Sequence, residues 1–436
     1  MRSIDSARRE RDLTPLTGRR ASVYSFADQA VSSGSNFALG VLVARVSGAD
    51  GLGSFGIAFL VWLAAFGLNR AFVCEPMTVC GSTTGDGDWS EGASASLALG
   101  LLIALPLAVA TGVILSRGFG SAGSVAALAP WLPSLLVQDY YRSMSFRRRR
   151  PDHALVSDVV FVLVQAAVSA AVVLLGAAGV ATILGGWGVG ATAGALTGLA
   201  LSRLRLNPWR GARYLAWLWS RSRWFLADFA TSFVFGQGYL LMLPIMLGLA
   251  QFGQYRAGMS LLGPVTALIF TAGSNVGLPG CVRQLRDEGV EGLGRYSARL
   301  TLVVAGLTIP FCLTVAILAP TLLRLVYGEQ FVAGAVITQL SGIGLCLFAL
   351  GYGGQVALKS ANQMRWLWTL RTVNGAFGMI AALVLVATVG LAGVGLASLV
   401  GNALYTVGIV FGYRRMRALP ARPAPLPVGP QRTSTP

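Results

Sequence analysis

The chain has 436 residues, of which 54% are hydrophobic and only 12% charged, and its mean hydropathy is +0.66. This composition excludes an ordinary soluble protein of this length and predicts an all-α integral membrane protein that crosses the bilayer many times. The formal net charge of +17 would favour nucleic acid binding in a soluble chain, but these basic residues flank apolar segments, where they report membrane orientation instead. We therefore expect no nucleic acid partner.

Residues 21–75 contain two apolar segments separated by the short break SGADGL at 47–52. Each segment is about the ~20 residues that a helix needs to cross a bilayer, so the pair predicts two membrane-spanning helices. Both nevertheless carry charge, at Asp28 and Arg45 in the first and at Arg70 and Glu75 in the second. An ionised side chain at the bilayer centre costs roughly 2.5 to 3.5 kcal/mol, so we expect these side chains to face protein or water.

The same helix pair recurs 200 residues later, without gaps. Asp28 aligns with Asp228, Gly48 with Gly248, Gly53 with Gly253 and Phe55 with Tyr255. An internal repeat of this kind predicts a transporter built from two related halves.

The remaining apolar segments complete these halves. Those at about 94–116, 123–145, 155–177 and 180–202 bring the first half to six spans, and those at about 223–249, 253–278, 299–319, 334–357, 367–389 and 391–413 give six more. We therefore expect about twelve transmembrane helices in two six-helix lobes related by pseudo-twofold symmetry. The predicted parts are a basic tail at 1–20, a first lobe at 21–202, an interfacial linker rich in Arg and Trp at 203–222, a second lobe at 223–413 and a Pro-rich tail at 414–436.

The basic residues predict the orientation. Of the 34 Lys and Arg residues, we place all but Arg45, Arg117, Arg256 and Arg324 towards the tails and the even-numbered connections. By the positive-inside rule both termini are then cytoplasmic, in a bacterial plasma membrane. We expect no cleavable signal peptide, because the first 20 residues are polar and rich in Arg.

The sequence offers few residues suited to catalysis or to metal binding. The five cysteines lie in or beside apolar segments without metal-ligand spacing, and His153 is the only histidine. The predicted outer connections are short, whereas an integral polymerase or ligase of surface glycans needs a loop large enough to hold an acceptor. We expect no enzyme, no metal and no cofactor.

Several segments resemble a known family when taken in order. They are DQAVSSGSNFALGVLVARVSGADGLGSFGIAF, GLNRAFVCEPM, LLVQDYYRSMSFRRRRPDHALVSDVVF with Asp139, Arg142 and Asp158, QYRAGMSLLGP, YGEQFVAGAVITQLSGIGL and GLAGVGLASLVGN. They are similar to the O-antigen-type polysaccharide flippases of the multidrug/oligosaccharidyl-lipid/polysaccharide exporter superfamily. The resemblance implies alternating access between two lobes, with a polyprenyl-pyrophosphate-linked sugar passed from the inner to the outer leaflet.

The charged residues of the spans supply the candidate binding groups. Arg256 opposes the charge bias, and its five-donor fork suits a pyrophosphate; the alternative is an interfacial anchor. Arg70 is a second candidate, although arginine is also expected near the cytoplasmic surface. Asn36 lies near the same helix face as Asp28 and is a candidate for sugar contact, or for a bond to a neighbouring helix.

Ion coupling would require a carboxylate within a span, and Asp28 and its repeat counterpart Asp228 are the candidates. Asp28 is also a candidate for substrate binding. An Asp early in a helix is also explained by the helix dipole. We further expect Asp139 and Arg142, three residues apart, to pair with each other in a structural role.

Taken with this resemblance, which alone implies the substrate, the sequence predicts a flippase for a lipid-linked oligosaccharide in cell-surface polysaccharide synthesis. The alternatives are a cation-coupled multidrug exporter of the same superfamily, and a membrane-embedded glycan polymerase or ligase. The expected partners are the lipid-linked sugar and membrane lipids, with glycosyltransferases or a polymerase as further candidates, and we expect a monomer.

Overall fold

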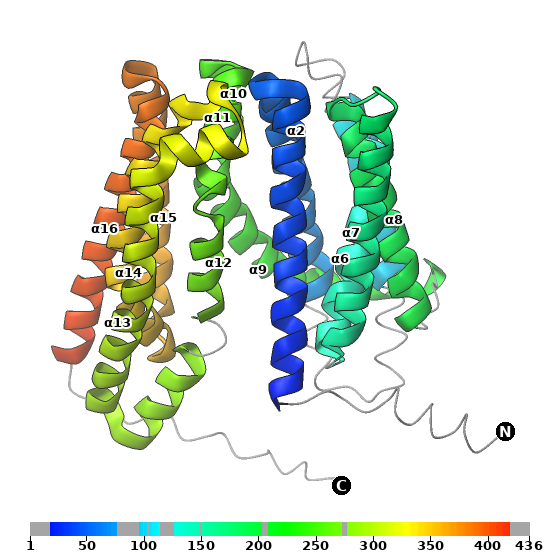
Figure 1. Cartoon of the computed structure of the whole chain (residues 1–436). Coiled ribbons are helices and arrows are strands. Elements are labelled where there is room, and N and C mark those ends of the chain that lie inside the picture. Colours follow the sequence, from blue (N-terminus) through cyan, green and yellow to red (C-terminus); the bar gives the residue numbers. More distant parts are fainter. Residues whose placement is uncertain are drawn as a thin grey trace, which may run out of the picture. The chain divides into compact units, whose positions relative to one another are not determined.

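A computed structural model describes residues 18–75, 96–98, 100–102, 104–113, 126–148, 150–202, 208–272 and 277–418. Arg117, most of the two predicted tails and the first part of the predicted linker lie outside these ranges. Within them, all regular structure is helical (Figure 1).

The regular elements are α-helices, with short 3-10 and π segments between some of them. They are α2 (Gly18–Asn69), η1 (Arg70–Cys74), η3 (Ala129–Trp131), α6 (Leu132–Arg147), α7 (Pro151–Leu174), α8 (Val180–Ser202), α9 (Pro208–Gln237), η4 (Gly238–Leu241), α10 (Leu243–Leu247), α11 (Leu249–Ser260), α12 (Gly263–Ala272), α13 (Leu278–Val326), η6 (Glu329–Gly334), α14 (Ala335–Ser360), α15 (Met364–Val389) and α16 (Leu391–Ala418).

Nine stretches of the described residues are long and apolar enough to cross a membrane, judged by length and composition. One of these, Val23–Cys74, has 52 residues and holds the two spans predicted at the start of the chain. The predicted fourth span is α6, which has only 16 residues, and the predicted eighth is divided between α11 and α12. With these included, the helices account for the twelve predicted spans.

The division of the eighth span corrects the expectation of one helix at about 253–278. Pro264 lies in the first turn of α12, and a proline disfavours helical geometry in the residue before it. Residues 208–222, expected as part of a linker, are helical and continue without a break through α9 to Gln237. At the other end of the chain, α16 continues to Ala418, into the segment expected as a tail.

The repeat is visible in the backbone. Gly48 interrupts α2 with a φ of 68°, and Gly248 separates α10 from α11 with a φ of 84°. Left-handed backbone of this kind favours glycine, which explains why both halves keep one at the equivalent position.

The two copies also pack against each other reciprocally. A Cβ added at Gly53 would run into the carbonyl oxygen of Leu249, and one added at Gly253 would run into that of Ala49. Residues 49 and 249 are repeat counterparts, as are 53 and 253, so exchanging the two copies of the repeat leaves this contact unchanged. This reciprocity is the property of an interface with a twofold axis, and it confirms the predicted pseudo-symmetry for these helices.

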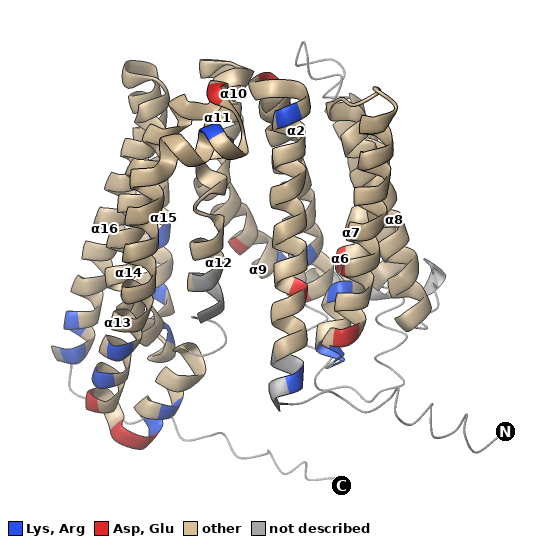
Figure 2. Cartoon of the chain, viewed as in Figure 1, with Lys and Arg blue, Asp and Glu red and all other residues tan. Residues whose placement is uncertain are grey.

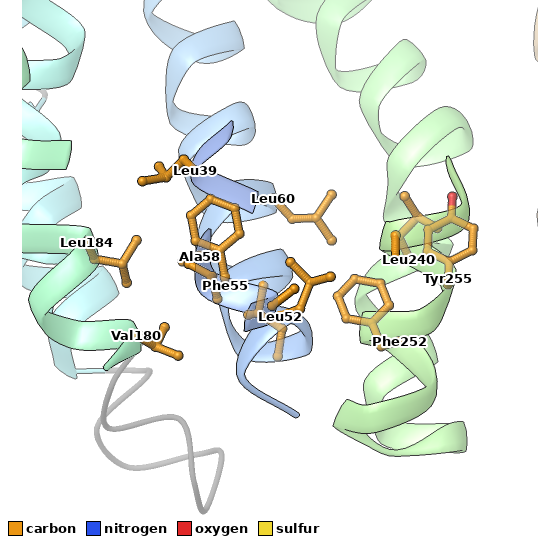
Figure 3. Close-up of a cluster of buried hydrophobic side chains, with 14 of the residues drawn as sticks. Leu39, Leu52, Phe55, Ala58, Leu60, Val180, Leu184, Leu240, Phe252 and Tyr255 are labelled. Carbon is orange, nitrogen blue, oxygen red and sulfur yellow. The ribbon is translucent and has the colours of Figure 1, made fainter. Parts of the chain in front are cut away.

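The chain divides into two compact units, each with a core of its own. Unit 1 comprises Met1–Leu261, Val315–Gln339 and Gly378–Ala397, and unit 2 comprises Leu262–Thr314, Leu340–Phe377 and Ser398–Pro436. Figure 3 shows part of the core of unit 1, where Phe55 of α2, Leu184 of α8 and Phe252 of α11 are buried. In unit 2 the core includes Tyr352, whose hydroxyl donates to the carbonyl oxygen of Ile269 at 2.7 Å.

Basic residues gather at one end of the helices of unit 2 (Figure 2). They lie at the start of α13 (Arg283, Arg286), the end of α14 (Lys359), the start of α15 (Arg365) and the end of α16 (Arg415, Arg417). Such one-ended clustering is the pattern on which the positive-inside rule is based.

Candidate functional site

A cavity of about 290 Å³ opens between helices of unit 1. Two predicted site residues, Asn36 on α2 and Arg256 on α11, lie in its wall. The full lining consists of Asn36, Phe37, Gly40, Leu52, Phe59, Leu60, Leu63, Gln237, Leu240, Phe252, Tyr255, Arg256, Met259, Ser260 and Tyr327. Among these lining residues, Arg256 alone has a charged side chain.

Arg256 has no carboxylate within 4 Å in the part of the chain that the structure describes. Its guanidinium carbon instead lies 4.2 Å from the ring centre of Phe59 and 5.3 Å from that of Phe55. Both rings belong to α2, so the contact joins the two repeat-related helix pairs. A cation over an aromatic face is stabilised by the ring quadrupole without using an N–H donor. The donors of Arg256 therefore remain available to an anionic ligand.

The polar groups beside Arg256 are hydroxyls. The hydroxyl oxygens of Ser260 and Tyr327 lie 2.5 Å apart, and the Tyr327 ring meets the edge of Phe37 at 6.2 Å between centres. Aromatic faces, hydroxyls and the amides of Asn36 and Gln237 thus surround a single cation. Such a lining suits a ligand that combines an anionic group with polar and apolar parts.

A second group of charged residues is buried among α2, α6 and α7, also within unit 1. Arg142 donates to Oδ2 of Asp28 from Nε at 3.0 Å and from Nη2 at 2.6 Å, and its Nε lies 3.2 Å from Oδ2 of Asp158. Gln138 donates to the other oxygen of Asp158 at 2.6 Å. The Asp28 side chain is fully buried, and its Oδ1 has no donor among the described residues.

Arg70 holds Asp139 with two hydrogen bonds, from Nε at 3.0 Å and from Nη2 at 2.7 Å, and its guanidinium lies 4.4 Å from the ring centre of Phe66. The predicted pairing of Asp139 with Arg142 is therefore wrong. Each of the two residues takes a partner from another segment: Arg142 gives two donors to one oxygen of Asp28, and Arg70 binds both oxygens of Asp139. Arg70 thus differs from Arg256 in that a carboxylate already uses two of its donors.

Asp228, the repeat counterpart of Asp28, is exposed on α9 and has no ion pair among the described residues. The two repeat copies of this aspartate therefore occupy different environments.

Of the residues predicted from the sequence, Asn36 and Arg256 line the cavity, whereas Asp28 and Arg70 lie in buried ion pairs outside its lining. The sequence assigned no role to Phe59 or Tyr327. Single aromatic residues in an apolar span give no signal of a ring that contacts a cation. Asp158 was noted only through the family resemblance, and Arg142 through that resemblance and its spacing from Asp139.

Comparison with known proteins adds the family and the fold. A model of a family described as polysaccharide biosynthesis protein matches residues 48–336. No curated protein matches the chain.

Three solved structures have the same fold. The lipid II flippase MurJ in an inward closed conformation superposes with a TM-score of 0.69 at 12% identity, over 91% of this chain and 88% of that one. A multidrug resistance MATE family transporter of the MOP superfamily, inward-facing, gives 0.64 at 16% identity, over 89% of this chain and 95% of that one. A MOP superfamily transporter from Pyrococcus furiosus Vc1, described with a binding pocket of reverse polarity, gives 0.59 at 16% identity, over 92% and 95%. These matches confirm the predicted fold class, a two-lobed all-α membrane protein.

Proposed function

The chain belongs to the polysaccharide biosynthesis protein family, and from this premise we propose that it flips a polyprenyl-pyrophosphate-linked oligosaccharide from the inner to the outer leaflet by alternating access. The fold is that of MOP superfamily transporters, and the protein is a multi-pass membrane protein. The substrate is the inferred part of this proposal.

One observation carries the substrate class. Arg256 is the only charged residue among those lining the cavity of unit 1, and no described carboxylate neutralises it. A guanidinium that keeps its donors is suited to a phosphate or pyrophosphate, which accepts two parallel hydrogen bonds from the fork. Asn36 and the hydroxyls of Ser260 and Tyr327 are the proposed contacts for the first sugars.

Arg70 is a second proposed contact for the pyrophosphate, and it would act in a different way. Two of its five N–H donors go to Asp139, so a phosphate would share or compete for the guanidinium with that carboxylate. We therefore expect Arg70 to matter in a later conformation and Arg256 in the initial complex.

The experiment is export in a strain that lacks the protein, complemented with Arg256→Ala. We expect a pyrophosphate-linked intermediate to accumulate on the inner leaflet, as in the uncomplemented strain. Arg324→Ala is the matched control, because Arg324 is exposed, pairs with Glu329 and is not among the cavity-lining residues. Full export by Arg256→Ala at normal membrane levels would refute the role of this arginine.

The second candidate function is a cation-coupled multidrug exporter, and the buried network favours it. Asp28 and Asp158 share one guanidinium, so the three groups carry one negative charge more than positive when all are ionised. A proton or a sodium ion on Asp28 would balance them, which makes Asp28 the proposed coupling site and the exposed Asp228 the weaker one. The cationic Arg256 in the cavity argues against organic cations as substrates, so drug resistance unchanged by deletion is the expected result.

A glycan polymerase or ligase is the third candidate. The family and the fold of the solved neighbours favour a transporter, and we propose that the protein has no catalytic activity. Translocated but unpolymerised intermediates on the outer leaflet of the deletion strain would reverse this conclusion. We further propose that the protein acts as a monomer in the bacterial plasma membrane, with the basic ends of its helices and both termini in the cytoplasm.

A further inference from the structure

The aromatic rings that contact Arg256 lead to an inference that rests on the proposed binding of a pyrophosphate by this residue. We propose that Phe59, assisted by Phe55, is a positioning residue: its ring holds the guanidinium of Arg256 within the cavity while leaving the N–H donors to an anionic ligand. The arrangement makes the cavity specific for a pyrophosphate or phosphate over an organic cation.

The ring of Phe59 is itself held in place by other aromatic side chains. Its centre lies 5.0 Å from that of Trp62 and 6.4 Å from that of Trp187, to which it is nearly parallel at 11°. Trp187 of α8 is almost fully buried, and Phe55 packs against it at 6.3 Å. The rings of Phe59 and Phe55 are therefore held in place by a buried core side chain as well as by their neighbours in the cavity wall.

The partners of other arginines show why a ring differs from a carboxylate. Arg70 and Arg142 each donate to buried aspartates, which neutralise the cation and occupy its donors. Phe59 attracts the cation through the face of its ring, carries no charge and accepts no conventional hydrogen bond. Arg256 is thereby fixed without being neutralised, which is the requirement for a group that must attract an anion.

Gly56 leaves space for the Arg256 side chain to reach these rings. A Cβ at this position would lie 3.0 Å from Cδ of Arg256 and 2.8 Å from a ring carbon of Phe252. The aliphatic stem of the arginine thus passes directly over the glycine on its way to the two rings. Gly56 is also the repeat counterpart of Arg256, so one copy of the repeat supplies the side chain and the other supplies the gap that admits it.

The test replaces Phe59 by mono-, di- and trifluorophenylalanine in the full-length protein. Fluorine withdraws negative charge from the ring face at nearly constant shape, so packing changes little while the attraction for a cation weakens. The probe is farnesyl pyrophosphate, whose affinity is measured with the protein in lipid nanodiscs. We expect the affinity to fall stepwise with fluorination, by between about 2-fold and 30-fold for the trifluoro ring.

Two results would overturn the inference. An affinity that does not change means that the ring only packs against the arginine, and an affinity that rises means that the ring competes with the ligand for the cation. Fluorination of Phe331, a buried ring outside the cavity lining, controls for the incorporation of the residue.

The same series in an Arg256→Ala background separates this inference from the proposed function. If Arg256→Ala leaves the affinity for farnesyl pyrophosphate intact, the proposed pyrophosphate site itself is wrong. If Arg256→Ala abolishes binding but the fluorinated series is flat, only the positioning role fails. If the pyrophosphate site and the positioning role are both right, fluorination of Phe59 does not change the affinity for farnesyl pyrophosphate any further in the Arg256→Ala background.

A substitution of Gly56 tests whether this position must lack a side chain. Gly56→Ala should displace the guanidinium and weaken binding of the probe at least several-fold, whereas Gly34→Ala on the same helix meets nothing within 4 Å and should not. Equal affinities for the two variants would contradict the role given to Gly56.

Discussion

Replacing Arg142 by methionine is the most informative perturbation of the buried network. The substitution keeps an apolar stem but leaves the carboxylates of Asp28 and Asp158 without their cation. The Arg142 side chain is 16% exposed, that of Asp28 0% and that of Asp158 3%, so the charges left behind are shielded from water. Removing one partner of a buried ion pair costs about 3 to 5 kcal/mol, and we expect Arg142→Met to fall in this range.

The free energy of unfolding, measured by denaturant titration in mixed micelles, checks this magnitude. Arg324→Met is the matched control, because Arg324 and its partner Glu329 are 58% and 73% exposed and a surface pair contributes about 0 to 1 kcal/mol.

A triple variant isolates the cause of the loss. Asp28→Asn and Asp158→Asn combined with Arg142→Met remove all three charges, and replacing a complete buried ion cluster by neutral groups is often close to neutral for stability. We therefore expect the triple variant to regain most of the stability that Arg142→Met loses. A triple variant as unstable as the single one would refute the argument, since the loss would then come from packing and not from unpaired charge.

Three further predictions address the repeat interface, the contact between Ala49 and Gln330, and ion coupling. Gly253→Ala should destabilise the protein by about 1 to 3 kcal/mol, because its Cβ meets the carbonyl oxygen of Ala49, whereas Gly306→Ala meets nothing within 4 Å and should not lower the free energy of unfolding. A cysteine pair replacing Ala49 and Gln330, whose backbone N–H and side-chain oxygen lie 3.4 Å apart, should stop transport when joined by a short thiol crosslinker, and transport at the full rate after crosslinking would exclude motion at this contact. Asp28→Asn should abolish the dependence of flipping in liposomes on an ion gradient while farnesyl pyrophosphate still binds, and an unchanged gradient dependence would remove Asp28 as the coupling site.

The features that the sequence predicted well are those that a local pattern determines. Apolar segments of the right length predict spans, because the bilayer thickness dictates helix length. The break between the first two helices could be placed at 47–52 because glycine tolerates the left-handed backbone found at Gly48, and its counterpart Gly248 followed from the repeat. Helix ends were less accurate, as the division between α11 and α12 shows.

The partners of the charged residues could not be predicted in the same way. Asp139 and Arg142 lie three residues apart, and in an isolated helix they would be each other's nearest opposite charge. In the folded protein Arg142 bonds to Asp28, 114 residues away, and Arg70 bonds to Asp139, 69 residues away. Inside a membrane the partner is chosen by which helices meet, and a single sequence does not contain that information.

The internal repeat bears on where the proposed site lies. Where its copies agree, as at Gly48 and Gly248 or at Gly53 and Gly253, they build the scaffold, and the contact that they form is symmetric. Where the copies differ in residue type or in environment, charged side chains are involved. Position 28 holds an aspartate buried beside Arg142, while position 228 holds one exposed to its surroundings.

Positions 56 and 256 show the same principle more sharply, because the glycine of one copy creates the space that the arginine of the other fills. A symmetric pair of arginines would place two like charges at one point near the axis, and a symmetric pair of glycines would leave the cavity without its cation. Only the unequal pair provides one positive charge beside aromatic rings. A ligand with a single anionic headgroup would match that asymmetry, and the loss of symmetry at this position, more than any motif, is the basis on which we propose the site.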